Sequence, residues 1–346
     1  MHALKKEDFN NFVETLISGY EVIAPVRKDI VRFEVLKEGD GRAGKVVFEN
    51  PLYPAKDFFL PLKEPFFHFK GACDNECSIE DCSDKKSAES AGKDEGDKVR
   101  AGEDCRGKSS RKRVFLMNRC DINGVHRNDL IMLEEPADPY YKEKRDNAIL
   151  VEIPCTKLER CSCENIGHID CYDLKLIDKG EGSGEYLVDA VTDKGRALVK
   201  DLHLPTAEIE MGEYKRSRIP DHGPKDIRGD NKAVWEQYGR ECFSCSACTV
   251  VCPTCMCFTI DGYLELSCEE GHRYREWASC QLLEFTKVAG GHVFRKDRGA
   301  RGRQRLMCKF QYFRDKFGHN RCVGCGRCNE ACPAGIDIFE YYSKLR

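Results

Sequence analysis

The sequence lacks any apolar run long enough to cross a lipid bilayer, and 33% of its 346 residues are charged. Its first residues, Met1 to Asp8, contain no apolar stretch of the kind that directs export. The 56 basic and 59 acidic residues leave a formal net charge of -3, so the chain as a whole does not favour a polyanionic partner. These absences predict a soluble, cytoplasmic protein that neither inserts into a membrane nor binds nucleic acid.

Recognisable nucleotide-binding and catalytic motifs are also missing. The glycine-rich stretch from Gly180 to Gly184 does not fit the G-x-G-x-x-G pattern, and there is no G-x4-G-K-[ST] phosphate loop. The sequence contains neither a G-x-S-x-G nucleophile motif nor an H-E-x-x-H zinc motif. We therefore expect no nucleotide site and no catalytic residue in this chain.

Cysteine, by contrast, is abundant, with 22 residues. A chain of this length does not need disulfides to be stable, and clustered thiols in a reducing compartment more often bind metal. Two runs near the C-terminal end have the spacing C-x2-C-x2-C-x3-C-P, one from Cys242 to Pro253 and one from Cys322 to Pro333. Three thiolates of such a tight loop bind one [4Fe–4S] cluster, and the loop amides stabilise its negative charge.

The fourth cysteine of each run is expected to bind the other cluster, as in two-cluster ferredoxins. The predicted ligands of the first cluster are Cys242, Cys245, Cys248 and Cys332. Those of the second cluster are Cys322, Cys325, Cys328 and Cys252. The alternative is structural zinc, but zinc sites usually have paired C-x2-C knuckles. The sequence therefore predicts a metal-binding protein with two [4Fe–4S] clusters that takes part in electron transport.

Two further groups of four cysteines lie upstream and leave room for one or two more metal sites. The first group, a candidate third cluster, is Cys120, Cys155, Cys161 and Cys163. Two of its members follow predicted strands, where ligand sites tend to collect, and the alternative is ordinary core cysteines. The second group is Cys73, Cys77, Cys82 and Cys105.

This second group lies in residues 71–112, a polar segment with too few large apolar side chains to order itself. Either a cluster or a zinc ion organises the segment, or it is a mobile insertion with incidental thiols. The remaining cysteines near the motifs are interpreted as packing residues. These are Cys255, Cys257, Cys268, Cys280 and Cys308.

The chain between the two motifs carries a strongly basic run from Arg295 to Lys309. It could be a solvated helix face, a docking surface for an acidic partner, or a source of positive charge that compensates the clusters. The candidate partner-binding residues are Arg298, Arg301, Arg303 and Arg305.

The predicted fold class is α+β. Residues 1–204 are expected to form a mixed α/β domain that begins with an amphipathic helix over 7–17 and includes the insertion 71–112. A polar linker over 205–230 precedes a mostly helical, ferredoxin-like dicluster domain at 231–346. The long insertion between its two cluster motifs has helical patterning over 274–288 and 301–317.

The run from Cys242 to Phe258 resembles the dicluster component of two related systems. One is the beta (iron–sulfur) subunit of cytosolic NAD(P)-linked nickel–iron hydrogenases, also called sulfhydrogenases. The other is the corresponding iron–sulfur component of anaerobic sulfite reductase. Further stretches that carry the resemblance are Arg275 to Cys280, Ala289 to Gly291, Arg301 to Arg305, Lys309 to Tyr312, Asp138 to Tyr141 and Cys155 to Cys163.

The resemblance implies a non-catalytic electron-transfer subunit of a multisubunit, anaerobic, cytoplasmic oxidoreductase complex. In such a hetero-oligomer, one partner would be a flavin- and NAD(P)-binding subunit. The other would be a catalytic redox subunit of the hydrogenase or sulfite reductase kind. The residues themselves leave two alternatives open. One is a scaffold or binding subunit in which iron–sulfur or zinc only stabilises the fold, and the other is an enzyme that acts at a cluster with an open site.

Overall fold

The computed structural model describes the chain except for residues 40, 71–110, 157–158, 181, 208–224 and 266–269. The predicted site cysteines Cys73, Cys77, Cys82 and Cys105, together with Cys268, lie outside the described residues. The chain forms two compact units. The first comprises Met1–Phe59, Ser110–Cys255 and Cys280–Arg346, and the second comprises Leu60–Ser109 and Met256–Ser279.

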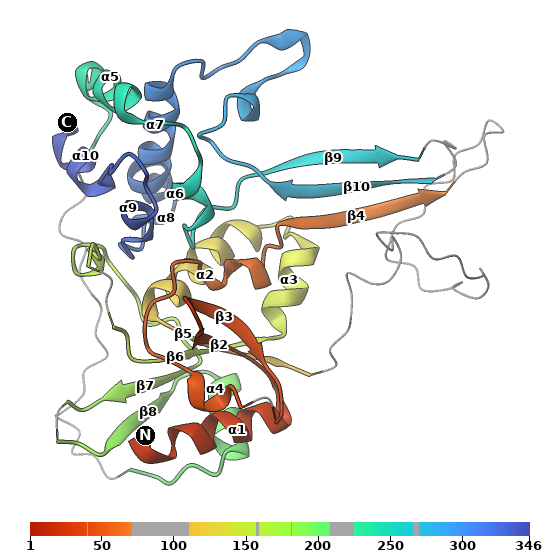
Figure 1. The fold of residues 1–346 in the computed structure, drawn as a ribbon, viewed down its shortest axis with the longest axis vertical. Helices are drawn as coiled ribbons and strands as arrows, with labels where there is room; N and C mark the ends of the chain where they lie inside the picture. The colour runs from red at the N-terminus through yellow and green to blue at the C-terminus, as the bar shows by residue number, and fades with distance from the viewer. Residues whose placement is uncertain (40, 71–110, 157–158, 181, 208–224, 266–269) are drawn as a thin grey trace. The chain divides into compact units, whose positions relative to one another are not determined.

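The first unit contains a seven-stranded sheet with the order β1-β8-β7-β6-β5-β2-β3 (Figure 1). Its strands are β1 (His2–Lys5), β2 (Glu21–Arg27), β3 (Val31–Leu36), β5 (Arg113–Met117), β6 (Ala148–Glu152), β7 (Leu174–Asp178) and β8 (Glu185–Ala190). The central strands β2, β5, β6 and β7 run parallel, whereas β3, β8 and β1 are antiparallel to their neighbours. The carboxyl ends of the parallel strands therefore share one edge, where ligand sites of such sheets collect.

Helices cover both faces of this sheet, which explains why its central strands are continuous apolar runs. The helices are α1 (Phe9–Gly19), α2 (Arg119–Met132), α3 (Pro139–Asp146) and α4 (Asp193–Asp201). Alternate residues of β5 point to opposite faces: Val114 joins the core with α1 and α4, whereas Phe115 stacks on Phe59. The expected mixed α/β character and the first helix are confirmed in this layered arrangement.

The cysteine motifs lie in the helical, C-terminal part of the first unit (Figure 1). Its elements are α5 (Lys232–Glu241), α6 (Ala247–Val250), α7 (Arg298–Met307), a π-helical turn (Cys308–Tyr312), α8 (Phe313–Phe317), α9 (Arg327–Glu330) and α10 (Ile338–Lys344). Tyr238, Leu306 and Phe310 belong to one apolar core here. The helix expected over 301–317 is confirmed, and Asp297 caps its start by accepting a hydrogen bond from the Ala300 amide.

The second unit contains a three-stranded antiparallel sheet with the order β4-β10-β9. The strands are β4 (Lys63–Lys70), β9 (Phe258–Leu264) and β10 (Glu270–Trp277). The helix expected over 274–288 is therefore wrong, because residues 270–277 pair with two strands and only short 3-10 turns follow. Cross-strand pairing and the buried ion pair of Arg275 with Glu64 override the local helical pattern.

Residues from both sides of the predicted linker 205–230 belong to the first unit. The expectation of a mostly helical domain at 231–346 is not confirmed, since β9 and β10 lie between the two motifs. No helix of the described residues is long and apolar enough to cross a membrane.

Asp173, at the start of β7, joins three elements of the first unit. Its carboxylate accepts hydrogen bonds from the Leu150 amide of β6 at 2.8 Å and from the Thr192 hydroxyl at 2.6 Å. Thr192 in turn caps α4 by accepting from the Gly195 amide.

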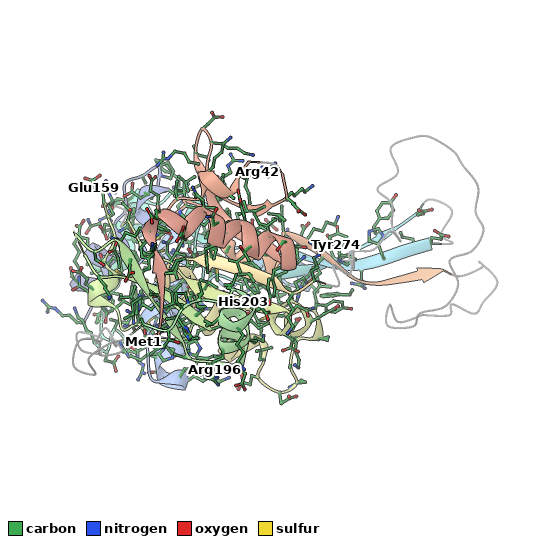
Figure 2. The ribbon with its side chains drawn as sticks, turned by 90° about the horizontal axis from the view of Figure 1, so that it is seen from below. Met1, Arg42, Glu159, Arg196, His203 and Tyr274 are labelled. Atoms are coloured by element: carbon green, nitrogen blue, oxygen red, sulfur yellow. The ribbon has the colours of Figure 1, made fainter. Side chains whose placement is uncertain are left out.

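We predict that Asp173→Ala lowers the free energy of unfolding by about 3 kcal/mol, because it leaves the buried Leu150 amide unpaired. Far-UV circular dichroism should show a melting temperature lower by at least about 4 °C. The control is Asp193→Ala, which removes only a surface pair with Arg196 and should cost less than about 1 kcal/mol. Arg196 is labelled in Figure 2. Equal melting temperatures for the two variants would contradict the role of Asp173 in joining β6, β7 and α4.

Candidate metal centres

The four cysteines predicted to bind the first cluster line a single cavity, which encloses about 490 Å³ of empty space including its opening to solvent. The three from the first motif, Cys242, Cys245 and Cys248, lie on the loop between α5 and α6 and on α6 itself. Left-handed backbone at Ser244 and Ser246 turns this loop tightly. Cys332 reaches the same cavity from the end of the second motif.

The second predicted group also comes together. Burial is the main cause that raises the pKa values of Cys322, Cys325 and Cys328, and the thiolate of Cys252 raises each of them further. Cys252 of the first motif therefore lies beside the three loop cysteines of the second motif. Cys328 additionally lines the cavity of the first group, so the two groups are neighbours.

The donor set fits an iron–sulfur cluster better than a hard cation, because it consists of thiols. In both loops a backbone amide points at a cysteine sulfur: Ser244 donates to Cys242 at 3.3 Å, and Gly324 donates to Cys322 at 3.4 Å. Within the described ranges, no three His, Cys, Asp or Glu side chains are grouped as ligands of one metal ion. The thiols of the first group, together with Cys328, instead line the cavity described above.

Cys120 and Cys155 of the third predicted group follow the adjacent parallel strands β5 and β6, as expected from the sequence. Burial is the main cause that raises the pKa of Cys120, and the charges of Cys325 and Cys155 contribute. Cys120 therefore lies close to both cysteines. Cys161 donates a hydrogen bond to the Gly324 carbonyl at 3.4 Å, and Cys163 lies beside the same glycine.

Two glycines allow the second motif to approach this group so closely. Gly324 (φ +61°) and Gly326 (φ +79°) both adopt left-handed backbone. A Cβ atom added to Gly324 would lie 2.7 Å from the Ser162 carbonyl oxygen, and one added to Gly326 would lie 2.5 Å from that of Arg160. The structure thus places the third group directly against the loop of the second motif.

A buried ion pair, which the sequence did not reveal, fixes this contact. Arg327 and Asp121 are 0% and 2% exposed, and two hydrogen bonds of 2.9 and 2.6 Å join them. Arg327 also donates to the Pro51 carbonyl at 2.6 Å and to the side chain of Asn50. Each partner is the sequence neighbour of a candidate ligand, Cys328 and Cys120 respectively. The only signal in the sequence was this adjacency.

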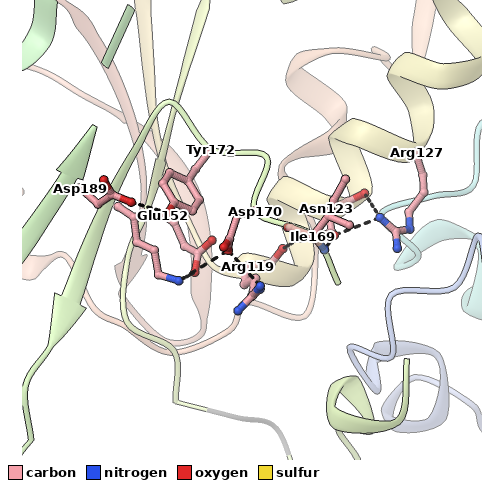
Figure 3. Close-up of polar contacts among 9 residues, drawn as sticks. Arg119, Asn123, Arg127, Glu152, Ile169, Asp170, Tyr172 and Asp189 are labelled. Atoms are coloured by element: carbon pink, nitrogen blue, oxygen red, sulfur yellow. Dashed lines mark hydrogen bonds and ion pairs between the residues drawn. The ribbon is translucent and has the colours of Figure 1, made fainter. Parts of the chain in front are cut away.

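A polar network along the same sheet edge holds the loop that contains residues 166–171 (Figure 3). Asp170 pairs with Arg119 at 3.0 Å, and the Asn123 side chain accepts from the Ile169 amide at 3.1 Å. Arg127 extends the network, since it donates to Asn123 and to the carbonyl of Asn320 just before the second motif. The network therefore ties the sheet edge to that motif.

His168 adds a further contact to the second motif. Burial lowers the pKa of His168 to about 3, so its ring is neutral near pH 7. Its Nε2 atom lies 2.8 Å from the Val323 carbonyl oxygen and acts as the donor. This hydrogen bond positions the loop rather than supplying an acid or a base.

The four arginines considered for partner binding separate into two pairs on α7. Arg298 and Arg303 are exposed, whereas Arg301 and Arg305 are buried. Arg301 donates to the carbonyls of Arg295 and Lys296, which lie just before its own helix. Arg305 points toward the cysteines. Partner docking therefore stays a prediction that rests on the exposed pair.

Two of the cysteines interpreted as packing residues lie beside candidate ligands. Cys280 is buried beside Cys248, and its neighbour Gln281 lines the first cavity. Cys255 lies beside Cys252 and is within 3.5 Å of Arg305.

Two comparisons relate this chain to known iron–sulfur proteins. A family model for the 4Fe-4S dicluster domain matches residues 241–336. The chain is 34% identical over 252 residues to sulfhydrogenase 2 subunit beta of Pyrococcus furiosus, an alignment that covers 67% of this chain and 73% of that protein. No solved structure matches the chain.

We predict that Gly326→Ala disrupts the second motif, because its Cβ would overlap the backbone of Arg160. Iron analysis should show the loss of about half of the iron bound by the two C-terminal motifs. The control is Gly318→Ala, which has the same left-handed backbone but no neighbour within 4 Å. It should cost about 1 kcal/mol of stability and leave the iron content unchanged. Full iron content in Gly326→Ala would contradict the close packing.

Proposed function

Because the chain belongs to the family of sulfhydrogenase beta subunits, we propose that it relays electrons from one redox partner to another. A flavin- and NAD(P)-binding subunit lies on one side of the relay, with a catalytic redox subunit on the other. The chain is an iron–sulfur electron-transfer subunit of an oxidoreductase complex. The catalytic partner is of the hydrogenase or sulfite reductase kind. The chain supplies the path, and the partners supply the two chemical reactions.

The observation that supports this proposal is the meeting of the two motifs through their fourth cysteines. Cys332 reaches the cavity of the first motif, and Cys252 reaches the cysteines of the second. Cys242, Cys245, Cys248 and Cys332 would hold one cluster, and Cys322, Cys325, Cys328 and Cys252 the other. Each bound cluster supplies one-electron redox chemistry, at a potential set by its hydrogen bonds, charge and burial.

The burial of the cysteines suggests an order along the path. The first group is open to solvent, since Cys245 is exposed and the adjacent Phe243 is 60% exposed. The second group is the inner one, because Cys252 and Cys325 are buried. The second group lies between the first group and Cys120. We therefore place the contact with one redox partner at the loop of Phe243 and Cys245.

The third group would extend the path to the carboxyl edge of the α/β sheet. Cys120, Cys155, Cys161 and Cys163 are its proposed ligands, and residues 1–204 form the domain that supports them. Residues 231–346 form the dicluster domain beyond the linker. A cluster or zinc ion held by Cys73, Cys77, Cys82 and Cys105 remains a separate proposal.

We predict that protein purified without oxygen contains about eight irons for the two C-terminal clusters, or about twelve if the third group binds a cluster. Electron paramagnetic resonance (EPR) should detect reduced clusters after dithionite treatment. If the third group binds a cluster, changing its four cysteines to serine should remove about four irons. Changing Cys73, Cys77, Cys82 and Cys105 to serine should leave the iron content unchanged unless these residues hold a cluster. Zinc in place of iron, or clusters that cannot be reduced, would favour a structural scaffold instead.

The crossed ligation gives a sharper prediction. Cys252→Ser should weaken the same EPR signal as Cys325→Ser, although Cys252 belongs to the first motif. Cys332→Ser should likewise weaken the same EPR signal as Cys245→Ser, although Cys332 belongs to the second motif. The control is Cys308→Ser, which lies in neither group and should leave both signals intact. If Cys252→Ser instead matched Cys245→Ser, each motif would bind its own cluster.

A further inference from the structure

Two cations are buried among the candidate ligands. Arg305 on α7 is 3% exposed, and Lys309 on the following π-helical turn is 2% exposed. They lie four residues apart, about one helical turn, and so face the same side of the helix. This side faces the cysteines of both motifs.

Arg305 contacts residues of the first motif and its flank. Its Nη2 atom donates to the Cys248 carbonyl at 3.0 Å, and its Nη1 atom lies 3.5 Å from the Cys255 sulfur. The side chain lines the cavity of the first group, which Cys328 of the second motif also lines. Arg305 therefore lies where the two groups meet.

Lys309 lies on the side of the second group. Its ammonium donates to the Thr254 hydroxyl at 2.6 Å, and Thr254 is itself in contact with the Cys252 sulfur at 3.4 Å. The backbone carbonyl of Lys309 accepts from the amides of Arg321 and Cys322, at the start of the second motif. The side chain and backbone of Lys309 thus reach both sequences that supply the second group.

Neither cation pairs with a carboxylate in the part of the chain that the structure describes. A buried charge without a counter-charge costs several kcal/mol, so a compensating negative charge must lie nearby. The negative partners available to these cations are the sulfur ligands.

From this geometry we propose that Arg305 and Lys309 are positioning residues that hold positive charge beside the clusters and raise their reduction potentials. The inference rests on the proposed function, because it requires clusters at both cysteine groups. Reduction adds one negative charge to a cluster, and a fixed cation stabilises that reduced state. Arg305 acts on both clusters, and Lys309 acts mainly on the one held by Cys252 and the second motif.

The test compares Arg305→Gln, Arg305→Lys, Lys309→Met and Lys309→Arg in the full-length protein. Iron content is measured first, and midpoint potentials are then obtained by EPR-monitored titration. Arg305→Gln should shift the potentials of both clusters to more negative values. Lys309→Met should lower mainly the potential of the cluster held by Cys252 and the second motif. In the charge-conserving variants Arg305→Lys and Lys309→Arg, both midpoint potentials should stay close to those of the unchanged protein. Lys316→Met, an exposed lysine seven residues after Lys309, is the control and should shift neither.

Loss of iron in Arg305→Gln that Arg305→Lys restores would also support the proposal, because charge is then required to hold the clusters. Loss of iron in both variants, or potentials that do not move in Arg305→Gln and Lys309→Met, would overturn it. Failure of the proposed function is distinguishable, since the unchanged protein would then lack reducible clusters before any variant was made.

Discussion

Arg327 and Asp121 form their ion pair where neither side chain reaches solvent, and the arrangement of the candidate sites depends on it. One partner begins α9 in the second cysteine motif, and the other lies in the first turn of α2, at the edge of the sheet. Removal of either would leave a buried charge unpaired, which is far more costly than loss of a surface pair. The pair therefore holds the second cysteine motif in a fixed position against the α/β layers.

The same contact explains why the chain is more than a ferredoxin joined to a second domain. Gly324 and Gly326 bring the motif backbone against residues 160–163, and His168 and Arg127 donate to carbonyls on either side of Cys322. Lys56, from the N-terminal part of the chain, donates to the carbonyls of Thr249 and Cys255 near the first motif. Both motifs are thus held by residues of the α/β region, and a rigid spacing between redox centres suits a relay.

Electrostatics is the second constraint on this region. Eight cysteines lie around two neighbouring sites, and as cluster ligands they would concentrate negative charge there. Loop amides, and the buried cations Arg305 and Lys309, offset that charge from within the chain. The basic run of α7 is therefore divided between two environments: the buried Arg305 faces the cysteines, and Arg298 and Arg303 face solvent.

The two C-x2-C-x2-C-x3-C-P motifs, the first helix and the positions of Cys120 and Cys155 after two strands could be predicted from the sequence. These features depend on spacing within a few residues, which local backbone geometry dictates. The sequence could not determine that residues 270–277 form the central strand of a sheet, because one of their two partner strands, at 63–70, is about two hundred residues away. Nor could it show that Arg327 meets Asp121, or which arginines of α7 are buried. Those outcomes depend on packing between segments that are far apart in the chain, and such packing is visible only in the folded structure.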